Sequence, residues 1–108
     1  MSQLPEYDVS IVIPCYMEEG HLLNSVKEIH AVMTSSRYKF EMIFVDDAGT
    51  DNTRELIFQI AKEYTNVRYL LHEKNVGRGG SFADGAKIAK GKYIGFLDID
   101  LELSLIHI

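Results

Sequence analysis

The stretch YIGFLDIDLE, from Tyr93 to Glu102, decides the fold of this chain. Its apolar first half runs directly into three carboxylates at alternate positions. Because side chains alternate between the two faces of extended backbone, Asp98, Asp100 and Glu102 turn towards one side. Carboxylate oxygens suit a hard divalent cation, Mg²⁺ or Mn²⁺, which commonly shares its coordination with substrate phosphates. The stretch predicts a strand that ends at a site for phosphate chemistry.

The composition is that of an ordinary globular domain. The chain has 108 residues, of which 46% are hydrophobic and 25% charged, and its formal net charge is −5. This length fits one domain or part of one. An acidic balance without a basic run argues against a nucleic-acid surface.

Neither secretion nor membrane insertion is indicated. The single Cys15 excludes an internal disulfide framework, and the longest apolar runs are far shorter than the roughly 20 residues that span a bilayer. We therefore expect a cytoplasmic protein, with Cys15 as a small buried residue. The histidines show no metal-binding spacing, and we interpret them as structural or exposed: His21, His30, His72 and His107.

Four short apolar runs alternate with three helical patterns. The runs begin near Val9, Phe40, Val67 and Tyr93. Continuous apolar runs of this kind are typical of parallel strands covered on both faces. The sequence predicts an α/β fold: an open, mostly parallel, Rossmann-like sheet with helices on both faces and strand order 3-2-1-4.

The three connections carry helical spacing of different strength. In the first, the apolar positions are Leu22, Val26, Ile29 and Met33. The second has Asn52 as a plausible cap with Glu55 three residues on, followed by Ile57, Ile60, Ala61 and Tyr64. The third, from about Ser81 to Lys90, has a small-residue face of Phe82, Ala83, Ala86 and Ala89, and we expect Gly91 to stop it.

Each strand of the expected sheet ends in polar residues. In order 3-2-1-4, strand order reverses between the first and fourth strands, where open α/β sheets bind ligands. This places Pro14-Cys15-Tyr16 opposite Asp98, with Asp46-Asp47 beside them. Asp46 and Asp47 are candidates for hydrogen bonds to a sugar or base; the alternative is a polar turn and helix cap. Tyr16 and Glu18 are candidates for contacts to a base or ribose; the alternative is that both are exposed surface residues without a binding role.

A glycine-rich turn, Asn75 to Ser81, precedes the third helical pattern. Backbone N–H groups at a helix amino terminus favour anions, and Arg78 is the best cation there for a phosphate oxygen. The turn satisfies neither the dinucleotide fingerprint nor the P-loop pattern. The alternative is a loop made only for tight turning.

Four motifs in this order resemble family 2 glycosyltransferases of the GT-A fold, in the dolichyl-phosphate mannosyltransferase-like branch. They are VSIVIPCYMEE at 9–19, VDDAGTDNT at 45–53, NVGRG at 75–79 and GKYIGFLDIDLE at 91–102. The resemblance implies a nucleotide-sugar site made of Pro14, Tyr16, Glu18, Asp46, Asp47, Arg78 and Asp98. It implies that Asp98, Asp100 and Glu102 bind a divalent metal. The chain departs from the pattern at Met17, where Asn is usual, and at Ala48-Gly49, where Gly-Ser is common.

The implied reaction is metal-dependent, inverting transfer of a sugar from a nucleotide-sugar donor, with a polyprenyl phosphate or a glycan as the acceptor. Residues 1–102 would be the donor-binding half, with the general base downstream, so we expect the fragment alone to be inactive and to expose an apolar sheet edge. A lipid acceptor would bring the whole protein to the cytoplasmic membrane face. Residues 103–108 match the translation of a common sequencing adapter, and we expect them to be non-native.

Other classes of function remain open at this point. One is a non-catalytic module that binds a nucleotide or metal. A sugar nucleotidyltransferase would need a glycine- and arginine-rich loop after the first strand, where this chain has Pro14 to Glu18. A phospho-acceptor receiver domain would need a lone Asp after the third strand, where this chain has His72-Glu73.

Overall fold

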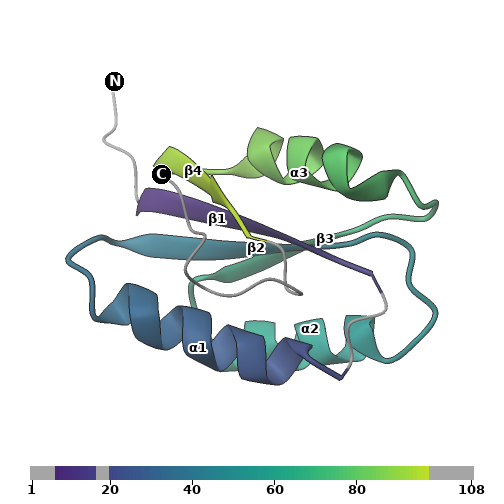
Figure 1. The fold of residues 1–108 in the computed structure, drawn as a ribbon, viewed down its shortest axis with the longest axis horizontal. Coiled ribbons are helices and arrows are strands. Elements are labelled where there is room, and N and C mark those ends of the chain that lie inside the picture. The colour runs from purple at the N-terminus through teal and green to yellow at the C-terminus, as the bar shows by residue number, and fades with distance from the viewer. Residues whose placement is uncertain (1–6, 17–19, 98–108) are drawn as a thin grey trace.

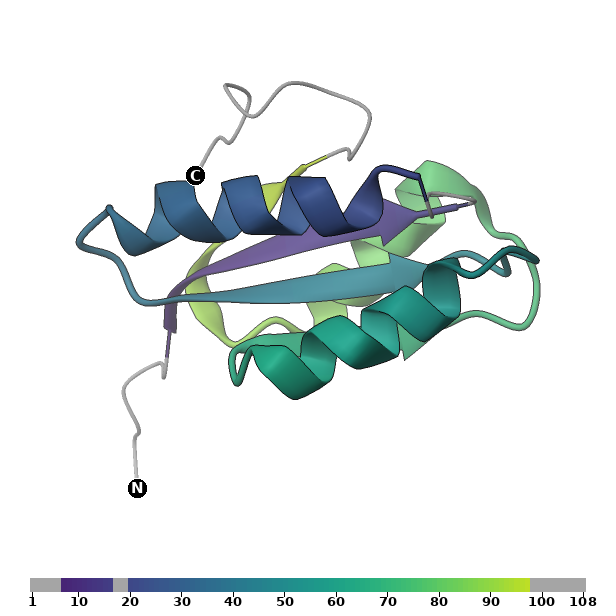
Figure 2. The same ribbon diagram turned by 90° about the horizontal axis from the view of Figure 1, so that it is seen from below.

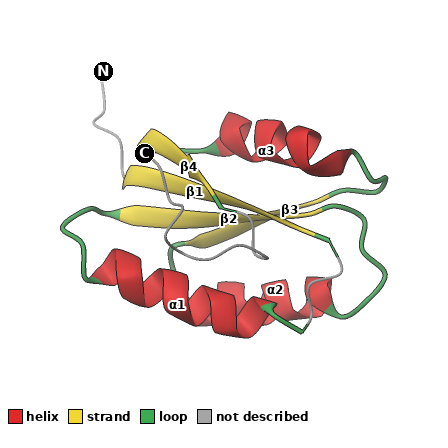
Figure 3. Cartoon of the chain, viewed as in Figure 1, coloured by secondary structure: helices red, strands yellow, loops and turns green. Residues whose placement is uncertain are grey.

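The structure is a computed structural model that describes residues 7–16 and 20–97. Strands and helices alternate along the chain (Figures 1 and 3). In order they are β1 (Tyr7–Cys15), α1 (Leu22–Thr34), β2 (Phe40–Asp46), α2 (Thr53–Glu63), β3 (Val67–Leu71), α3 (Gly77–Ile88) and β4 (Gly91–Phe96). The predicted metal-binding stretch at 98–102 and the suspected non-native residues 103–108 lie outside the described residues.

The four strands form one parallel sheet in the order β3-β2-β1-β4, as predicted. Helices α1 and α2 cover one face, and α3 lies alone on the other (Figures 1 and 2). Right-handed crossovers produce this arrangement, because the first two connections step across the sheet in one direction and the third steps back in the other. The predicted fold class is confirmed.

The larger core lies between the sheet and the pair α1 and α2. Every residue of β2 is buried, as a central strand covered on both faces requires. The four predicted apolar positions of α1 are all buried, while Lys27 and Glu28 face outwards. In α2, Ile57 and Ile60 are buried, and Ala61 and Tyr64 pack against the same cluster.

Helix α3 approaches the sheet closely because small residues face it. Its buried residues are Ser81 and Gly85. A Cβ atom on Gly85 would lie 2.4 Å from Cγ1 of Val12, so no larger residue fits without displacement. The expected small-residue face is confirmed, but its position was partly wrong, since Ala83 is exposed. Phe82 and Ala89 do pack against the β1 and β2 side chains beneath.

Two helix boundaries differ from the sequence expectations. Helix α3 begins at Gly77, four residues before the expected start, and ends at Ile88, so that Gly91 opens β4 instead of stopping the helix. At α2, Asn52 occupies the N-cap position, but its side chain makes no capping bond. The Asp51 carboxylate accepts the Thr53 N–H at 3.1 Å instead. Asp and Asn are both good acceptors at this position, so the sequence alone could not choose between them.

Strand β4 ends the sheet and carries exposed apolar side chains among the described residues. Tyr93, Ile94 and Phe96 are 48%, 37% and 44% exposed. This agrees with the expected apolar sheet edge. Within residues 7–16 and 20–97, no helix is both long enough and apolar enough to cross a bilayer.

Candidate functional site

The carboxyl ends of the strands meet at one edge of the sheet. Cys15 of β1 pairs with Asp46 of β2, which pairs with Leu71 of β3. On the other side of β1, the Leu97 N–H donates to the carbonyl of Val12 at 3.1 Å. The loops after β2 and β3 lie together at the right of Figure 1. We call this the carboxyl edge, and it contains the switch point that the strand order predicts.

The structure describes five of the predicted site residues, and all five belong to this edge. Pro14 is half-buried in β1, and Tyr16, just after that strand, is 52% exposed. Asp46 and Asp47 are buried at the end of β2, and Arg78 is exposed at the second position of α3. The other predicted site residues, Glu18, Asp98, Asp100 and Glu102, lie outside the described residues. Within the described part of the chain, no cluster of three or more His, Cys, Asp or Glu side chains could hold a metal.

Asp46 and Asp47 are neighbours in sequence, but they bind different partners. The Arg54 side chain of α2 donates from Nε and Nη2 to Oδ2 of Asp46, at 3.0 and 2.8 Å. Nη2 also donates to the carbonyl of His72 at 3.2 Å. Arg54 therefore neutralises Asp46 and connects α2 to the end of β3. No described residue donates to the buried Oδ1 of Asp46.

The Asp47 carboxylate holds the amino end of α3. Its Oδ1 accepts the Val76 N–H at 2.8 Å, and its Oδ2 accepts the Gly77 N–H at 2.9 Å. The side-chain amide of Asn75 donates to the carbonyl of Asp47 at 3.2 Å. Asp47 thus caps α3 from a distant part of the sequence, a role that local capping patterns cannot reveal.

Two opposing effects act on the Asp47 carboxyl. Burial raises its pKa, but the N–H groups of Val76 and Gly77 and the ring of His72 favour the charged form and together hold its pKa below the usual range. Asp47 is therefore an anion in the folded protein at neutral pH.

His72 and Asp84 complete this cluster, and sequence reasoning missed both. Nδ1 of His72 lies 2.9 Å from Oδ1 of Asp47, and Nε2 lies 2.8 Å from Oδ2 of Asp84. The expectation that the histidines are structural or exposed did not anticipate a bridge between two carboxylates. The sequence separations, 25 positions from Asp47 to His72 and 12 from His72 to Asp84, match no recognisable motif spacing.

The glycine-rich turn binds an anion, and that anion is the protein's own. The sequence predicted that N–H groups at the start of the third helix would receive a phosphate. In the structure, the N–H groups of Val76 and Gly77 are bonded to Asp47. Gly77 has φ +84°, a left-handed conformation that favours glycine. Part of this turn is therefore dedicated to the connection with β2.

Ala48 also adopts a left-handed conformation, with φ 61°. Glycine is the residue that best tolerates this region, and a Cβ atom there costs roughly 1–2 kcal/mol. The departure noted in the sequence, Ala48-Gly49 in place of Gly-Ser, thus places local strain beside Asp47.

A second polar network lies at the opposite, amino edge of the sheet. Oε1 of the buried Glu41 accepts a hydrogen bond from Nε of Arg68 at 2.9 Å. Its Oε2 accepts one from Oγ of Ser10 at 2.5 Å and one from the Lys90 N–H at 2.8 Å. Ser10 Oγ in turn accepts the Gly91 N–H at 2.7 Å. This network connects all four strands, and sequence reasoning did not find it.

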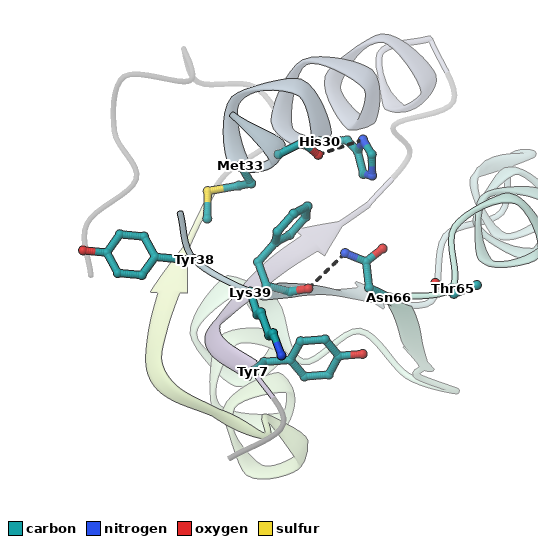
Figure 4. Close-up of a pocket in the computed structure, with 9 residues that line it drawn as sticks. Tyr7, His30, Met33, Tyr38, Lys39, Thr65 and Asn66 are labelled. Atoms are coloured by element: carbon teal, nitrogen blue, oxygen red, sulfur yellow. Dashed lines mark hydrogen bonds between the residues drawn. The ribbon is translucent and has the colours of Figure 1, made fainter. Parts of the chain in front are cut away.

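A shallow pocket of about 460 Å³ also lies at the amino edge (Figure 4). Its lining is largely aromatic and neutral, and includes Tyr7, His30, Tyr38 and Asn66, with Lys39 as a charged group. No carboxylate lines it. It lies at the opposite edge of the sheet from the predicted site residues that the structure describes.

An open parallel sheet in the order β3-β2-β1-β4, with helices on both faces (Figures 1 and 2), places the chain in the doubly wound α/β class. The chain belongs to glycosyl transferase family 2, whose family model matches residues 10–105. The family predicted from the four sequence motifs is confirmed.

Curated relatives are glycosyltransferases of several kinds. The chain is 39% identical over 95 residues to a poly(ribitol-phosphate) beta-glucosyltransferase of Bacillus spizizenii, covering 85% of this chain and 14% of that protein. It is 33% identical over 102 residues to the dolichyl-phosphate beta-glucosyltransferase of Saccharomyces cerevisiae, covering 88% of this chain and 30% of that protein. The chain thus spans only a minor part of these relatives.

Solved structures show the same fold. A mannosyltransferase from Pyrobaculum calidifontis, in complex with GDP-Man and Mn²⁺, matches with a TM-score of 0.76 at 20% identity, over 87% of this chain and 28% of that one. TarS from S. aureus, in complex with UDP-GlcNAc, matches with a TM-score of 0.69 at 27% identity, over 86% of this chain and 26% of that one. The GT-A fold class expected from the sequence is confirmed.

Proposed function

We propose that the carboxyl edge binds the nucleoside diphosphate part of a nucleotide-sugar donor, and that this chain supplies the donor-binding part of a sugar-transferring enzyme. The observation that carries this proposal is the convergence of Tyr16, Asp46-Asp47 and the start of α3 at the switch point of a family 2 fold. Membership of the family and the nucleotide sugars bound by the two structural relatives support it.

Residues of three loops have separate roles in this proposal. Pro14 and Tyr16, with Glu18, contact the nucleoside, because an aromatic ring can stack on a base and a carboxylate can accept from ring or ribose donors. Asp47 holds the loop after β3 in place through the Val76 and Gly77 N–H groups. Asp46, at the end of β2, supports the same loop through Arg54, which also donates to the carbonyl of His72. Arg78 follows the Gly77 whose N–H Asp47 binds, and in this proposal its guanidinium meets the diphosphate.

The acidic stretch that follows β4 in the sequence has ligands that suit a divalent cation. Three carboxylates at alternate positions offer only oxygen ligands, which suit Mg²⁺ or Mn²⁺. We propose that Asp98 and Asp100, with Glu102, hold it. When bound, such a cation stabilises the negative charge of a departing diphosphate. A mannosyltransferase with this fold was solved with Mn²⁺.

The finer features of the reaction rest on the sequence resemblance. We propose inversion at the anomeric carbon, with attack from the face opposite the nucleoside diphosphate. A polyprenyl phosphate acceptor is ionised already, whereas a hydroxyl acceptor requires a general base. A curated relative in yeast is named for transfer involving dolichyl phosphate, and one in Bacillus for poly(ribitol-phosphate). In this proposal the acceptor site and the general base belong to a part of the protein beyond residue 102.

Calorimetry on the intact protein tests the metal site. UDP and GDP are titrated separately with MnCl₂ and with EDTA, using the wild type and the double variant Asp98→Asn, Asp100→Asn. We expect one of the two nucleotides to bind with Mn²⁺, and the variant to bind it about tenfold or more weakly because two metal ligands lose their charge. Glu28→Gln, on the exposed face of α1, is the matched control and should bind as the wild type does.

Absence of binding by the wild type with both nucleotides would contradict the proposed function. Binding that EDTA does not weaken would contradict the metal assignment while leaving the nucleotide site in place.

A further inference from the structure

Both ring nitrogens of His72 face carboxylate oxygens. An ionised carboxylate only accepts hydrogen bonds, and a neutral imidazole has one N–H to donate. Asp47 lies 2.9 Å from one ring nitrogen and Asp84 lies 2.8 Å from the other, so the ring bridges two carboxylates. The side chain of His72 is 13% exposed, which strengthens both contacts relative to bulk water.

The bridge connects β2, β3 and α3 at the point where α3 begins. Asp47 follows β2, His72 follows β3, and Asp84 lies on α3. The same Asp47 carboxylate holds the Val76 and Gly77 N–H groups, so the ring of His72 fixes the orientation of an acceptor that orients the α3 amino end.

The bridge also engages carboxylates at the edge where a diphosphate would bind. The ring of His72 lies between Asp47 and Asp84 and contacts one oxygen of each. Lys87 Nζ lies 3.8 Å from the other oxygen of Asp84, and Arg54 pairs with the neighbouring Asp46. Without His72, both carboxylates lose this contact, and uncompensated negative charge at this edge repels a diphosphate.

We propose that His72, bridging Asp47 and Asp84, is a positioning residue that prepares the α3 amino end for the donor diphosphate. This inference rests on the proposed function of the carboxyl edge. His72 acts through Asp47 and through local charge, and it does not contact the reacting atoms.

The test compares His72→Gln with His30→Gln in the intact protein. His30 is also half-buried but lies at the amino edge, where its Nδ1 contacts Thr34. Calorimetry measures binding of UDP and GDP with MgCl₂ at neutral pH. Hydrogen exchange measures protection of the Val76 and Gly77 amides without nucleotide.

We expect His72→Gln to weaken nucleotide binding about fivefold, since a hydrogen bond to a charged group is lost. The Val76 and Gly77 amides should exchange faster in His72→Gln, and His30→Gln should match the wild type in both measurements. The double variant His72→Gln, Asp84→Asn removes one negative charge, so it should recover part of the lost binding.

The outcomes separate the two proposals. If the wild type binds neither nucleotide, the proposed function fails and the positioning role fails with it. If the wild type binds and His72→Gln binds equally well, the positioning role alone is overturned. A variant that loses thermal stability while its Val76 and Gly77 amides exchange as in the wild type would also overturn it, since a purely structural histidine behaves in that way.

Discussion

Glu41 and Asp46 are buried carboxylates near opposite ends of the same strand, β2, and their surroundings differ. Both oxygens of Glu41 are occupied, by Arg68, Ser10 and the Lys90 N–H. Asp46 has Arg54 on one oxygen, and no described residue donates to the other. A buried acceptor without a hydrogen-bond donor destabilises the folded protein by about 1–3 kcal/mol. Glu41 at the amino edge has donors on both oxygens and avoids this destabilisation.

The difference separates a network that holds the fold together from one associated with a binding site. The amino edge joins four strands through hydrogen bonds, and both carboxylate oxygens of Glu41 have donors. The carboxyl edge keeps strained and incompletely paired groups together, namely Ala48 and Asp46. Such features persist where surrounding structure imposes them, and they gather at functional sites.

The largest expected effect is on stability at the amino edge. Glu41→Ala leaves Arg68, Ser10 and the Lys90 N–H without their shared acceptor, and we expect a loss of about 3 kcal/mol in the free energy of unfolding. Urea denaturation measures it. The exposed Glu28→Ala on α1 is the control and should change stability by less than about 0.5 kcal/mol. If Glu41→Ala were no more destabilising than the control, the amino edge would not be a structural network.

At the carboxyl edge, Asp47→Asn should reduce stability by about 1–2 kcal/mol at neutral pH, because hydrogen bonds to a charged acceptor become weaker. The pKa of Asp47 is lowered in the folded protein from the ordinary value of 3.8. Its contribution is therefore fully present above that value and is lost as the pH falls through the lower folded pKa.

Unfolding measured between about pH 7 and pH 2 checks this sign, since the wild type should lose this contribution in acid and Asp47→Asn should lack it. Asp8→Asn, at an exposed carboxylate of the amino edge that accepts the Lys39 N–H, is the control. An acid profile that Asp47→Asn leaves unchanged would contradict the capping role of Asp47.

The smallest expected effect concerns Ala48. Because its φ is 61°, Ala48→Gly should relieve strain, although the unfolded chain gains freedom. We expect a net stabilisation of roughly 0.5–1 kcal/mol, measured as a higher midpoint of thermal unfolding. Ala31→Gly, at an exposed position inside α1, should destabilise by about 1 kcal/mol. A destabilising Ala48→Gly would show that no strain is stored beside Asp47.

The sheet could be predicted from the sequence because apolar runs and helical spacing are patterns within short segments of the chain. The strand order and the carboxyl edge follow from that alternation. The start of α3 could not be predicted in the same way. Gly79 and Gly80 argue against a helix on propensity, but the Asp47 carboxylate and packing on β1 and β2 override that preference. The His72 bridge and the Glu41 network join residues far apart in sequence, and nothing in local spacing identifies such partners.

The most direct test of the carboxyl edge uses the paramagnetism of Mn²⁺. Amide signals of the ¹⁵N-labelled protein are recorded with UDP or GDP and MgCl₂, and then with a small amount of MnCl₂. We predict that amides of Tyr16, Ala48 and Gly77 broaden first, while those of Lys39 and Asn66 at the amino edge stay sharp. Broadening that begins at Lys39 and Asn66, or that does not depend on the nucleotide, would contradict the account.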